Sequence, residues 1–275
     1  YEQVTRTDEA NLRRLRIEAA DLTHVMRTRL VNSLRATAQR RWVSGKDEGK
    51  LDSRRLHRAV LGLGDDVFKQ RSAKTTLNTA VALAIDHSGS MYGQKIELAA
   101  ESAIVIGDVL QALRVPFSVY GYSTHGHANA GGPPNTKLYA RWNGLWIRHY
   151  HTFNGHWEQG AARLAGARHN IQENTLDGES VKYGIQQLLY RPEKRKILFV
   201  FNDGAPYPGR GHTGRCQQYL LDIVTASRKA GVEVIAFGIQ DNNVKHYYDN
   251  YVVINNLQDL VKEPLQILDA MLRKG

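Results

Sequence analysis

The chain has 275 residues, of which 42% are hydrophobic and 23% are charged, a balance typical of a soluble globular protein. No stretch reaches the roughly 18 consecutive apolar residues of a membrane-spanning helix, so we expect no membrane partner. Cys216 is the only cysteine, which excludes an intramolecular disulfide and favours a reducing, cytoplasmic location.

Basic residues are concentrated in the first part of the chain. Residues 1–75 contain 17 Lys and Arg against 10 Asp and Glu, and so contribute +7 of the net charge of +10. Such a surface can bind an acidic protein segment or nucleic acid, or it can simply be solvated. No zinc-finger spacing or aromatic RNA-binding signature accompanies the charge, so an acidic protein partner is favoured over nucleic acid.

The same residues, 1–75, are predicted to form a basic, helical N-terminal appendage. Apolar residues recur at helical spacing over 8–41. Gly45 and Gly49 interrupt that pattern, and a second, short helix is predicted over 51–61.

Residues 76–275 are predicted to form an α/β domain with a doubly wound, mainly parallel, Rossmann-like sheet. The run Thr79–Asp86 is apolar up to its final acid, which is typical of a strand buried on both faces, and 196–203 has the same form. Strands that alternate with helices indicate βαβ units.

Further strands are predicted at 116–122, 232–238 and 251–254, and helices at 95–113, 178–190, 214–230 and 257–273. An insertion with weak periodicity occupies about 123–170.

Two of the predicted strands end in an aspartate, Asp86 and Asp203. Ligands of open α/β sheets bind beyond the carboxyl ends of the strands, so both acids are expected at one site. Alternate positions of the turn after Asp86 can point Ser88 and Ser90 to the same side, and carboxylate and hydroxyl oxygens suit Mg²⁺. The sequence therefore predicts one Mg²⁺, or another divalent cation, held by Asp86, Ser88, Ser90 and Asp203. The alternative is that the turn only caps the following helix.

Asp86-x-Ser88-x-Ser90, followed later by Asn202-Asp203-Gly204, resembles the metal-ion-dependent adhesion site (MIDAS) of von Willebrand factor A (vWA) domains. In that family a threonine from another loop joins the site. The resemblance assigns this position to Thr175, and Asp177 is the competing residue. His87, inside the turn, is expected to face outward.

Longer segments resemble the carboxy-terminal half of the CobT subunit of aerobic cobaltochelatase. The matching segments are Asp177-Gly178-Glu179-Ser180, 191–198, Asp203-Gly204-Ala205-Pro206, His246-Tyr247-Tyr248 and Gly49-Lys50-Leu51-Asp52-x-x-Arg55-Leu56. The similarity covers most of the chain and is weakest over 123–165.

This resemblance implies a non-catalytic, metal-dependent subunit of an ATP-dependent complex that inserts Co²⁺ into a corrin ring. The implied partners are an AAA+ ATPase (CobS-like) and a large tetrapyrrole-binding subunit (CobN-like), and an Asp or Glu of a partner would complete the metal site. The alternative is a vWA adaptor with which a MoxR-like AAA+ ATPase remodels a protein partner.

The chain itself has no G-x-x-x-x-G-K-[ST] phosphate loop, so ATP is expected only in the partner subunit. Ser88 and Ser90 lack the G-x-S-x-G setting of a nucleophile, and no catalytic residue is predicted.

Histidines and aromatic residues are frequent in the predicted insertion. His125-x-His127 and His149-x-His151 would each place two rings on one face of a strand, which suggests a second metal site or a partner surface. No acid or cysteine stands at a recognisable spacing, so surface or packing roles are favoured. The aromatic residues either form a partner or tetrapyrrole surface or cover the insertion's own core; they are Trp142, Trp146, Tyr150, Phe153 and Trp157.

Overall fold

The computed structural model describes residues 5–37, 42–64, 66–71, 78–125, 144–208, 213–262 and 266–267. Its main sheet contains β4 (Thr79–Asp86), β5 (Phe117–His125), β6 (Gly144–His151), β7 (Arg195–Asn202), β8 (Val232–Ile239) and β9 (Tyr251–Ile254). The order is β6-β5-β4-β7-β8-β9, and only the β5–β6 pair is antiparallel. The mainly parallel α/β sheet predicted from the sequence is confirmed.

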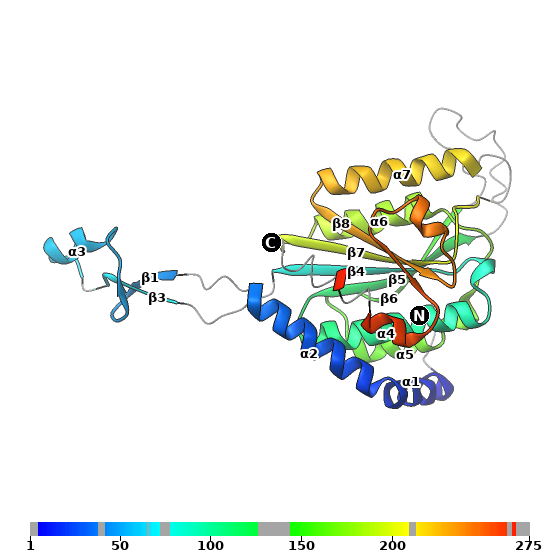
Figure 1. The fold of residues 1–275 in the computed structure, drawn as a ribbon, viewed down its shortest axis with the longest axis horizontal. Helices are drawn as coiled ribbons and strands as arrows, with labels where there is room; N and C mark the ends of the chain where they lie inside the picture. The colour runs from blue at the N-terminus through cyan, green and yellow to red at the C-terminus, as the bar shows by residue number, and fades with distance from the viewer. Residues whose placement is uncertain are drawn as a thin grey trace.

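Helices cover both faces of this sheet (Figure 1). One face carries α1 (Arg6–Glu18), α2 (Ala20–Thr37), α4 (Gln94–Ala112) and α5 (Trp157–Ala165), and the other carries α6 (Asp177–Leu189) and α7 (Thr213–Lys229). Short 3₁₀ helices complete the connections: η1 (Gly89–Met91), η2 (Ala167–Asn170), η3 (Asn243–His246) and η4 (Leu257–Val261).

The central strand β4 shows why the sequence there lacks alternation. All eight of its residues are buried. Val81, Leu83 and Ile85 pack into the core on the α4 side, whereas the alanines at 80, 82 and 84 pack on the α6 side. A strand covered by helices on both faces needs apolar residues at every position. Asp86, at its carboxyl end, is therefore the first acid that the strand can present to a ligand.

The N-terminal helices belong to the same core as the sheet. The predicted helix over 8–41 is two helices, α1 and α2, separated at Ala19. Leu12, Leu15 and Met26 are buried in the cluster that also contains α4. The helical pattern in this part of the sequence thus reflects burial against α4 and α5. The division of the chain at residue 75 stays a prediction.

The helical expectation for the rest of residues 1–75 is confirmed only at α3, which lies inside the short helix predicted over 51–61, and the three strands found there were not predicted. Residues 42–71 form a small antiparallel sheet with the order β1-β3-β2 and one short helix. Gly45 lies where the register of β1 against β3 shifts, and Gly49 lies just before β2; their positive φ angles of 75° and 125° disfavour other residues. The buried Asp52 accepts a hydrogen bond from Ser44 Oγ at 2.5 Å. Figure 1 shows this unit apart from the main sheet, and its elements are β1 (Trp42–Lys46), β2 (Lys50–Leu51), α3 (Leu56–Val60) and β3 (Phe68–Arg71).

Arg16 links α1 to the two helices beneath it. Its guanidinium donates to Asp108 Oδ1 and Oδ2 at 2.9 Å each and to Glu158 Oε1 at 2.6 Å. We expect Arg16→Ala to lower the free energy of unfolding by about 1 kcal/mol, because a two-pronged, half-buried pair is lost. Arg14→Ala is the control, since Arg14 makes only an exposed pair with Glu18 at 3.9 Å. Equal urea midpoints for both variants would contradict this role of Arg16.

The carboxy-terminal end differs from its prediction in part. The helix expected over 257–273 begins as the 3₁₀ helix η4, and most of the remainder lies outside the described residues. None of the helices in the described part combines the length and the apolar composition that crossing a membrane demands.

Candidate functional site

The two strand-end acids come together because β4 and β7 are neighbours in the sheet. Ile85 pairs with Phe201, so Asp86 and Asp203 follow at the same edge. Ser88 Oγ donates to Asp86 Oδ2 at 3.0 Å, and Ser90 Oγ donates to Asp203 Oδ1 at 2.8 Å. The two serine hydroxyls are 3.1 Å apart. An unbroken chain of polar contacts therefore joins the two acids through the serines.

Backbone hydrogen bonds fix the turn that carries the serines, residues 86–90. Ser88 N donates to Asp86 Oδ1 at 2.8 Å, which shapes the turn from within. His87 N donates to Tyr122 O on β5 at 2.9 Å. On the other side, Gly89 N donates to Glu173 O at 3.0 Å. The turn is thus held between β5 and the segment that precedes α6, and its oxygens keep a fixed arrangement.

Thr175 and Asp177 lie at the same edge, and both are buried. Thr175 Oγ1 donates to Asp177 Oδ2 at 2.9 Å, and Tyr122 OH donates to Asp177 Oδ1 at 2.7 Å. Both oxygens of Asp177 already accept hydrogen bonds, whereas the Thr175 oxygen has its lone pairs left. Both residues line the pocket described next, so the choice between them stays a prediction.

A pocket of about 420 Å³ opens at this edge of the sheet. It brings together all six residues of the predicted site, from β4, the turn after it, the segment before α6 and the end of β7. It is lined by Asp86, Ser88, Ser90, Glu173, Asn174, Thr175, Asp177, Asp203, Gly204, Ala205, Tyr207, Asp241 and Asn243.

The electrostatics of the pocket favour a cation. Burial raises the pKa of Asp86 well above its ordinary value, and the charges of Asp177 and Asp203 raise it further. Burial also raises the pKa of Asp177, although hydrogen bonds from Tyr122, Thr175 and Asn202 lower it. These shifts mean that the protein disfavours several ionised carboxyl groups at once. A bound cation would stabilise their charged forms.

One cation from the protein partly meets this demand. Lys95, near the start of α4, donates from Nζ to Asp203 Oδ2 at 2.5 Å. Among the described residues of the pocket, this one ammonium group could not balance Asp86, Asp177 and Asp203 if all three were ionised. Nothing in the sequence pattern signalled this contact, because Lys95 belongs to neither of the motifs around the two acids.

The donor set fits Mg²⁺ better than a softer metal. Among the described residues, no three His, Cys, Asp or Glu side chains cluster so that they could hold a metal by themselves. The predicted ligands that line the pocket, Asp86, Ser88, Ser90, Thr175, Asp177 and Asp203, offer only carboxyl and hydroxyl oxygens. Hard oxygen ligands with some retained water are the coordination that Mg²⁺ prefers.

In the described part of the insertion, the histidines of the two predicted pairs do not form a common site. Residues 123–170 contain β6, α5 and η2, and His127 lies outside the described residues. A β-bulge between Val119 and Tyr120 interrupts the pairing of β5 with β6. As a result, the ring of His149 packs against Tyr120 and Tyr183 on the α6 side. The ring of His151 packs against Phe117 and Trp157 on the α5 side.

The expectation that His149 and His151 share one face is therefore wrong. Burial lowers the pKa of both, for His151 to about 4, with Arg163 and His156 as further causes. His151 is buried and its ring belongs to the packed interior, whereas His149 is exposed and its ring contacts Tyr120 and Tyr183 at the surface; His125 is exposed at the end of β5.

The aromatic residues are divided between core and edge. Tyr150 and Trp157 are buried and belong to the core on the α4 side, so they do not form an exposed contact surface. Trp146 and Phe153 are partly buried, and Trp142 lies outside the described residues.

His87 points inward, which corrects the expectation that it faces outward. Its side chain is fully buried, and burial lowers its pKa to about 4. A histidine at a variable position of a turn gave no sequence signal for this burial, because the cavity that accepts it is formed by β5 and β6.

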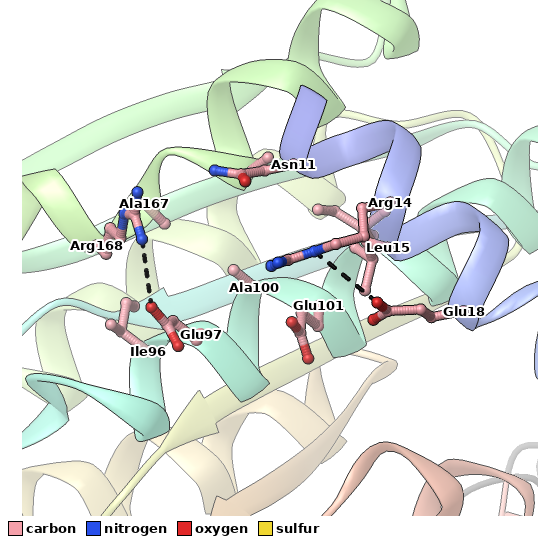
Figure 2. A pocket seen from close by; sticks show the side chains of 12 residues that line it. Asn11, Arg14, Leu15, Glu18, Ile96, Glu97, Ala100, Glu101, Ala167 and Arg168 are labelled. Carbon is pink, nitrogen blue, oxygen red and sulfur yellow. Dashed lines mark ion pairs between the residues drawn. The ribbon is translucent and has the colours of Figure 1, made fainter. Parts of the chain in front are cut away.

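A second, smaller pocket of about 80 Å³ lies between α1 and α4 (Figure 2). Its rim carries two ion pairs, Arg14 with Glu18 at 3.9 Å and Arg168 with Glu97 at 3.7 Å. Glu101 also lines this pocket. Burial raises its pKa, and the charges of Glu97 and Glu18 raise it further. The rim charges largely pair with one another, so we interpret this pocket as the seam where α1 packs on α4.

Comparison with known proteins supports the assignment of the fold. A model of the family described as "Cobalamin biosynthesis protein CobT VWA domain" matches residues 67–270. The uncharacterized protein YojO of Bacillus subtilis (strain 168) is 22% identical over 182 residues, which are 65% of this chain and 26% of YojO. The chain thus spans about a quarter of the length of this relative.

Two solved structures illustrate the structural likeness. The PilB minor pilin from Streptococcus sanguinis superposes with a TM-score of 0.52 at 13% identity, over 74% of this chain and 64% of PilB. The SpRpn10 VWA domain gives a TM-score of 0.47 at 15% identity, over 68% of this chain and 96% of that domain. At such identities the likeness concerns the fold alone.

Proposed function

Because the chain belongs to the family of CobT VWA domains of cobalamin biosynthesis, whose model matches residues 67–270, we propose that it is the metal-dependent, non-catalytic subunit of a cobaltochelatase-like complex. In this proposal the chain binds one Mg²⁺ in the pocket at the carboxyl ends of β4 and β7. A carboxylate of a partner protein then binds to that ion.

The observation that carries the proposal is the polar chain Asp86–Ser88–Ser90–Asp203 in a buried, acidic pocket. Without a cation, burial raises the pKa of Asp86, and repulsion from Asp177 and Asp203 raises it further. Arranged around a divalent cation, they would become mutually compatible. A bound Mg²⁺ supplies an open coordination position that a carboxylate can fill.

The residues of the chain have separate tasks in this proposal. Asp86 and Asp203 provide charge, and Ser88 and Ser90 provide neutral oxygens that keep the ion from being fully neutralised. Thr175, from the segment before α6, or Asp177, the first residue of α6, completes the site. The fixed turn keeps these oxygens in place, so that a partner's carboxylate binds only when the metal is present.

The partners in this proposal are an AAA+ ATPase and a large tetrapyrrole-binding subunit. ATP hydrolysis by the AAA+ ATPase would move the partner subunit whose carboxylate is bound through the metal. Co²⁺ would enter the corrin as the substrate of the complex. The test is reconstitution of the chain with both subunits encoded in the same genome, followed by measurement of ATP-dependent Co²⁺ insertion.

We expect insertion with the wild-type chain and at least a hundredfold less with Asp86→Asn, with Asp222→Asn as the exposed control. Metal-dependent binding of the ATPase without any Co²⁺ insertion would replace this proposal with the alternative of a protein-remodelling adaptor. ATPase binding that is equally strong with Asp86→Asn would overturn the metal grip itself.

A further inference from the structure

The His87 side chain ties the metal-binding turn to the edge strand β6. Its Nδ1 lies 3.0 Å from Ile85 O, and its Nε2 lies 2.6 Å from Tyr150 OH. A carbonyl oxygen can only accept, so Nδ1 carries the proton and Nε2 accepts from the tyrosine hydroxyl. One imidazole therefore bridges the end of β4 and the carboxyl end of β6.

The His87 ring fills a space between side chains of β6 and a glycine of β5. It stacks on Tyr150 and lies against Trp146, with ring centroids 5.6 Å apart in both cases. Beneath it, β5 carries Gly121, where an added Cβ would lie 2.7 Å from His87 Cε1. Any side chain at position 121 would push the ring out of place. The glycine, the tyrosine and the histidine thus form one fitted unit.

His87 stands between two proposed metal ligands along the chain. Its neighbour Asp86 ends β4, and its neighbour Ser88 bonds to Asp86 through both its backbone N–H and its hydroxyl. The His87 carbonyl also accepts from Gln172 N at 2.7 Å, which holds the segment leading to Thr175. A displacement of His87 would therefore move ligands on both sides of the pocket.

We infer that His87 is a positioning residue, which sets the metal-binding turn relative to β6 through the Tyr150 hydroxyl. This inference rests on the proposed function for the identity of the ion. Its consequence is that β6, the antiparallel edge strand, controls the geometry of the metal site. A partner that shifts β6 would change the metal affinity without touching a ligand. Groups that orient metal ligands typically change affinity by about 10–100-fold when they are removed.

Tyr150→Phe tests this inference, because it removes only the hydroxyl and keeps the ring. Tyr183→Phe is the matched control, since Tyr183 OH contacts His149 Nε2 at 2.8 Å on the opposite face of the same strand. We expect the Mg²⁺ dissociation constant, measured calorimetrically on the full chain, to rise about tenfold in Tyr150→Phe and less than twofold in Tyr183→Phe.

Amide hydrogen exchange over residues 86–91 provides a readout that does not depend on metal. In the metal-free protein, we expect faster exchange there in Tyr150→Phe than in Tyr183→Phe. Gly121→Ala provides a second route, since it displaces the ring without removing any partner of His87. Its control is Gly144→Ala on β6, where the nearest atom to an added Cβ lies at 3.8 Å.

The outcomes separate the inference from the proposed function. If wild-type protein binds no Mg²⁺, the proposed function fails, and exchange over 86–91 alone decides the role of His87. Unchanged exchange and unchanged Mg²⁺ affinity in both Tyr150→Phe and Gly121→Ala would overturn the inference. A loss of global stability without either local change would assign His87 to packing and would also overturn it.

Discussion

Mg²⁺ should raise the melting temperature of the wild-type chain and leave that of the Asp86→Asn variant unchanged. A ligand at 100 times its dissociation constant adds about 2.7 kcal/mol of stability, which for a domain of this size corresponds to roughly 5–10 °C. Asparagine keeps the shape of the side chain and an oxygen that can accept from Ser88 N, but it removes the charge that attracts the ion. The measurement is a thermal unfolding curve with EDTA and with saturating Mg²⁺.

The pH dependence of this effect has a defined sign. The pKa of Asp86 is raised in the folded, metal-free protein, so between its ordinary and its raised value the folded state holds a proton that the unfolded state has lost. The metal-free protein therefore loses stability as pH rises through that window. Mg²⁺ binds the ionised carboxylate, so its stabilising effect should grow as pH rises.

The controls for this prediction are straightforward. Asp86→Asn should show neither the loss in stability that the titration of Asp86 causes nor the response to Mg²⁺. Asp222→Asn, at an exposed position on α7, should behave like the wild type. A Mg²⁺ response of equal size in Asp86→Asn and wild type would contradict the assignment of Asp86 as a ligand.

Lys95→Met should destabilise the metal-free protein by about 2 kcal/mol and the Mg²⁺-bound protein much less. The Asp203 carboxylate is almost fully buried, and Lys95 is its cationic partner at 2.5 Å. Removing one member of a buried pair leaves an uncompensated charge, and the partial exposure of Lys95 moderates the cost. Mg²⁺ can replace the lost positive charge, so the variant should bind Mg²⁺ about tenfold more tightly than the wild type.

Urea unfolding in EDTA and in saturating Mg²⁺ measures both quantities. Lys182→Met on the exposed surface of α6 serves as the control and should change neither. An equal loss of stability in Lys95→Met with and without Mg²⁺ would show that Mg²⁺ does not replace the Lys95 ammonium group beside Asp203. That result would contradict the prediction.

The sequence predicted those features that depend on short segments. A strand buried on both faces and ending in an acid is visible in residues 79–86 and 196–203, and the turn after Asp86 carries its serines at fixed spacing. Because both strands end at the same edge, their acids had to meet once the sheet order placed β4 beside β7. The residues alone did not predict that order, which first appears in the structure.

Features that depend on tertiary contacts could not be predicted in this way. The bulge in the β5–β6 pairing that sends His149 and His151 to opposite faces leaves no periodic signal. The inward position of His87 depends on the space above Gly121, which is distant in sequence. The strands at 42–71 were missed because they are short, and their glycines resemble helix breaks.

Residues 8–37 illustrate a different limit. Their helical periodicity was recognised, but the pattern does not say which surface covers the apolar stripe. Leu12, Leu15 and Met26 turn out to pack in the main core beside α4.

The most direct test of the central claim is the anomalous diffraction of manganese in crystals of the full chain soaked with Mn²⁺, which takes the same oxygen ligands as Mg²⁺. The account predicts one dominant peak, within coordination distance of oxygens from Asp86, Ser88, Ser90 or Asp203. A map in which manganese binds elsewhere on the chain, for example at the β6 histidines, and leaves this pocket without a peak would contradict it.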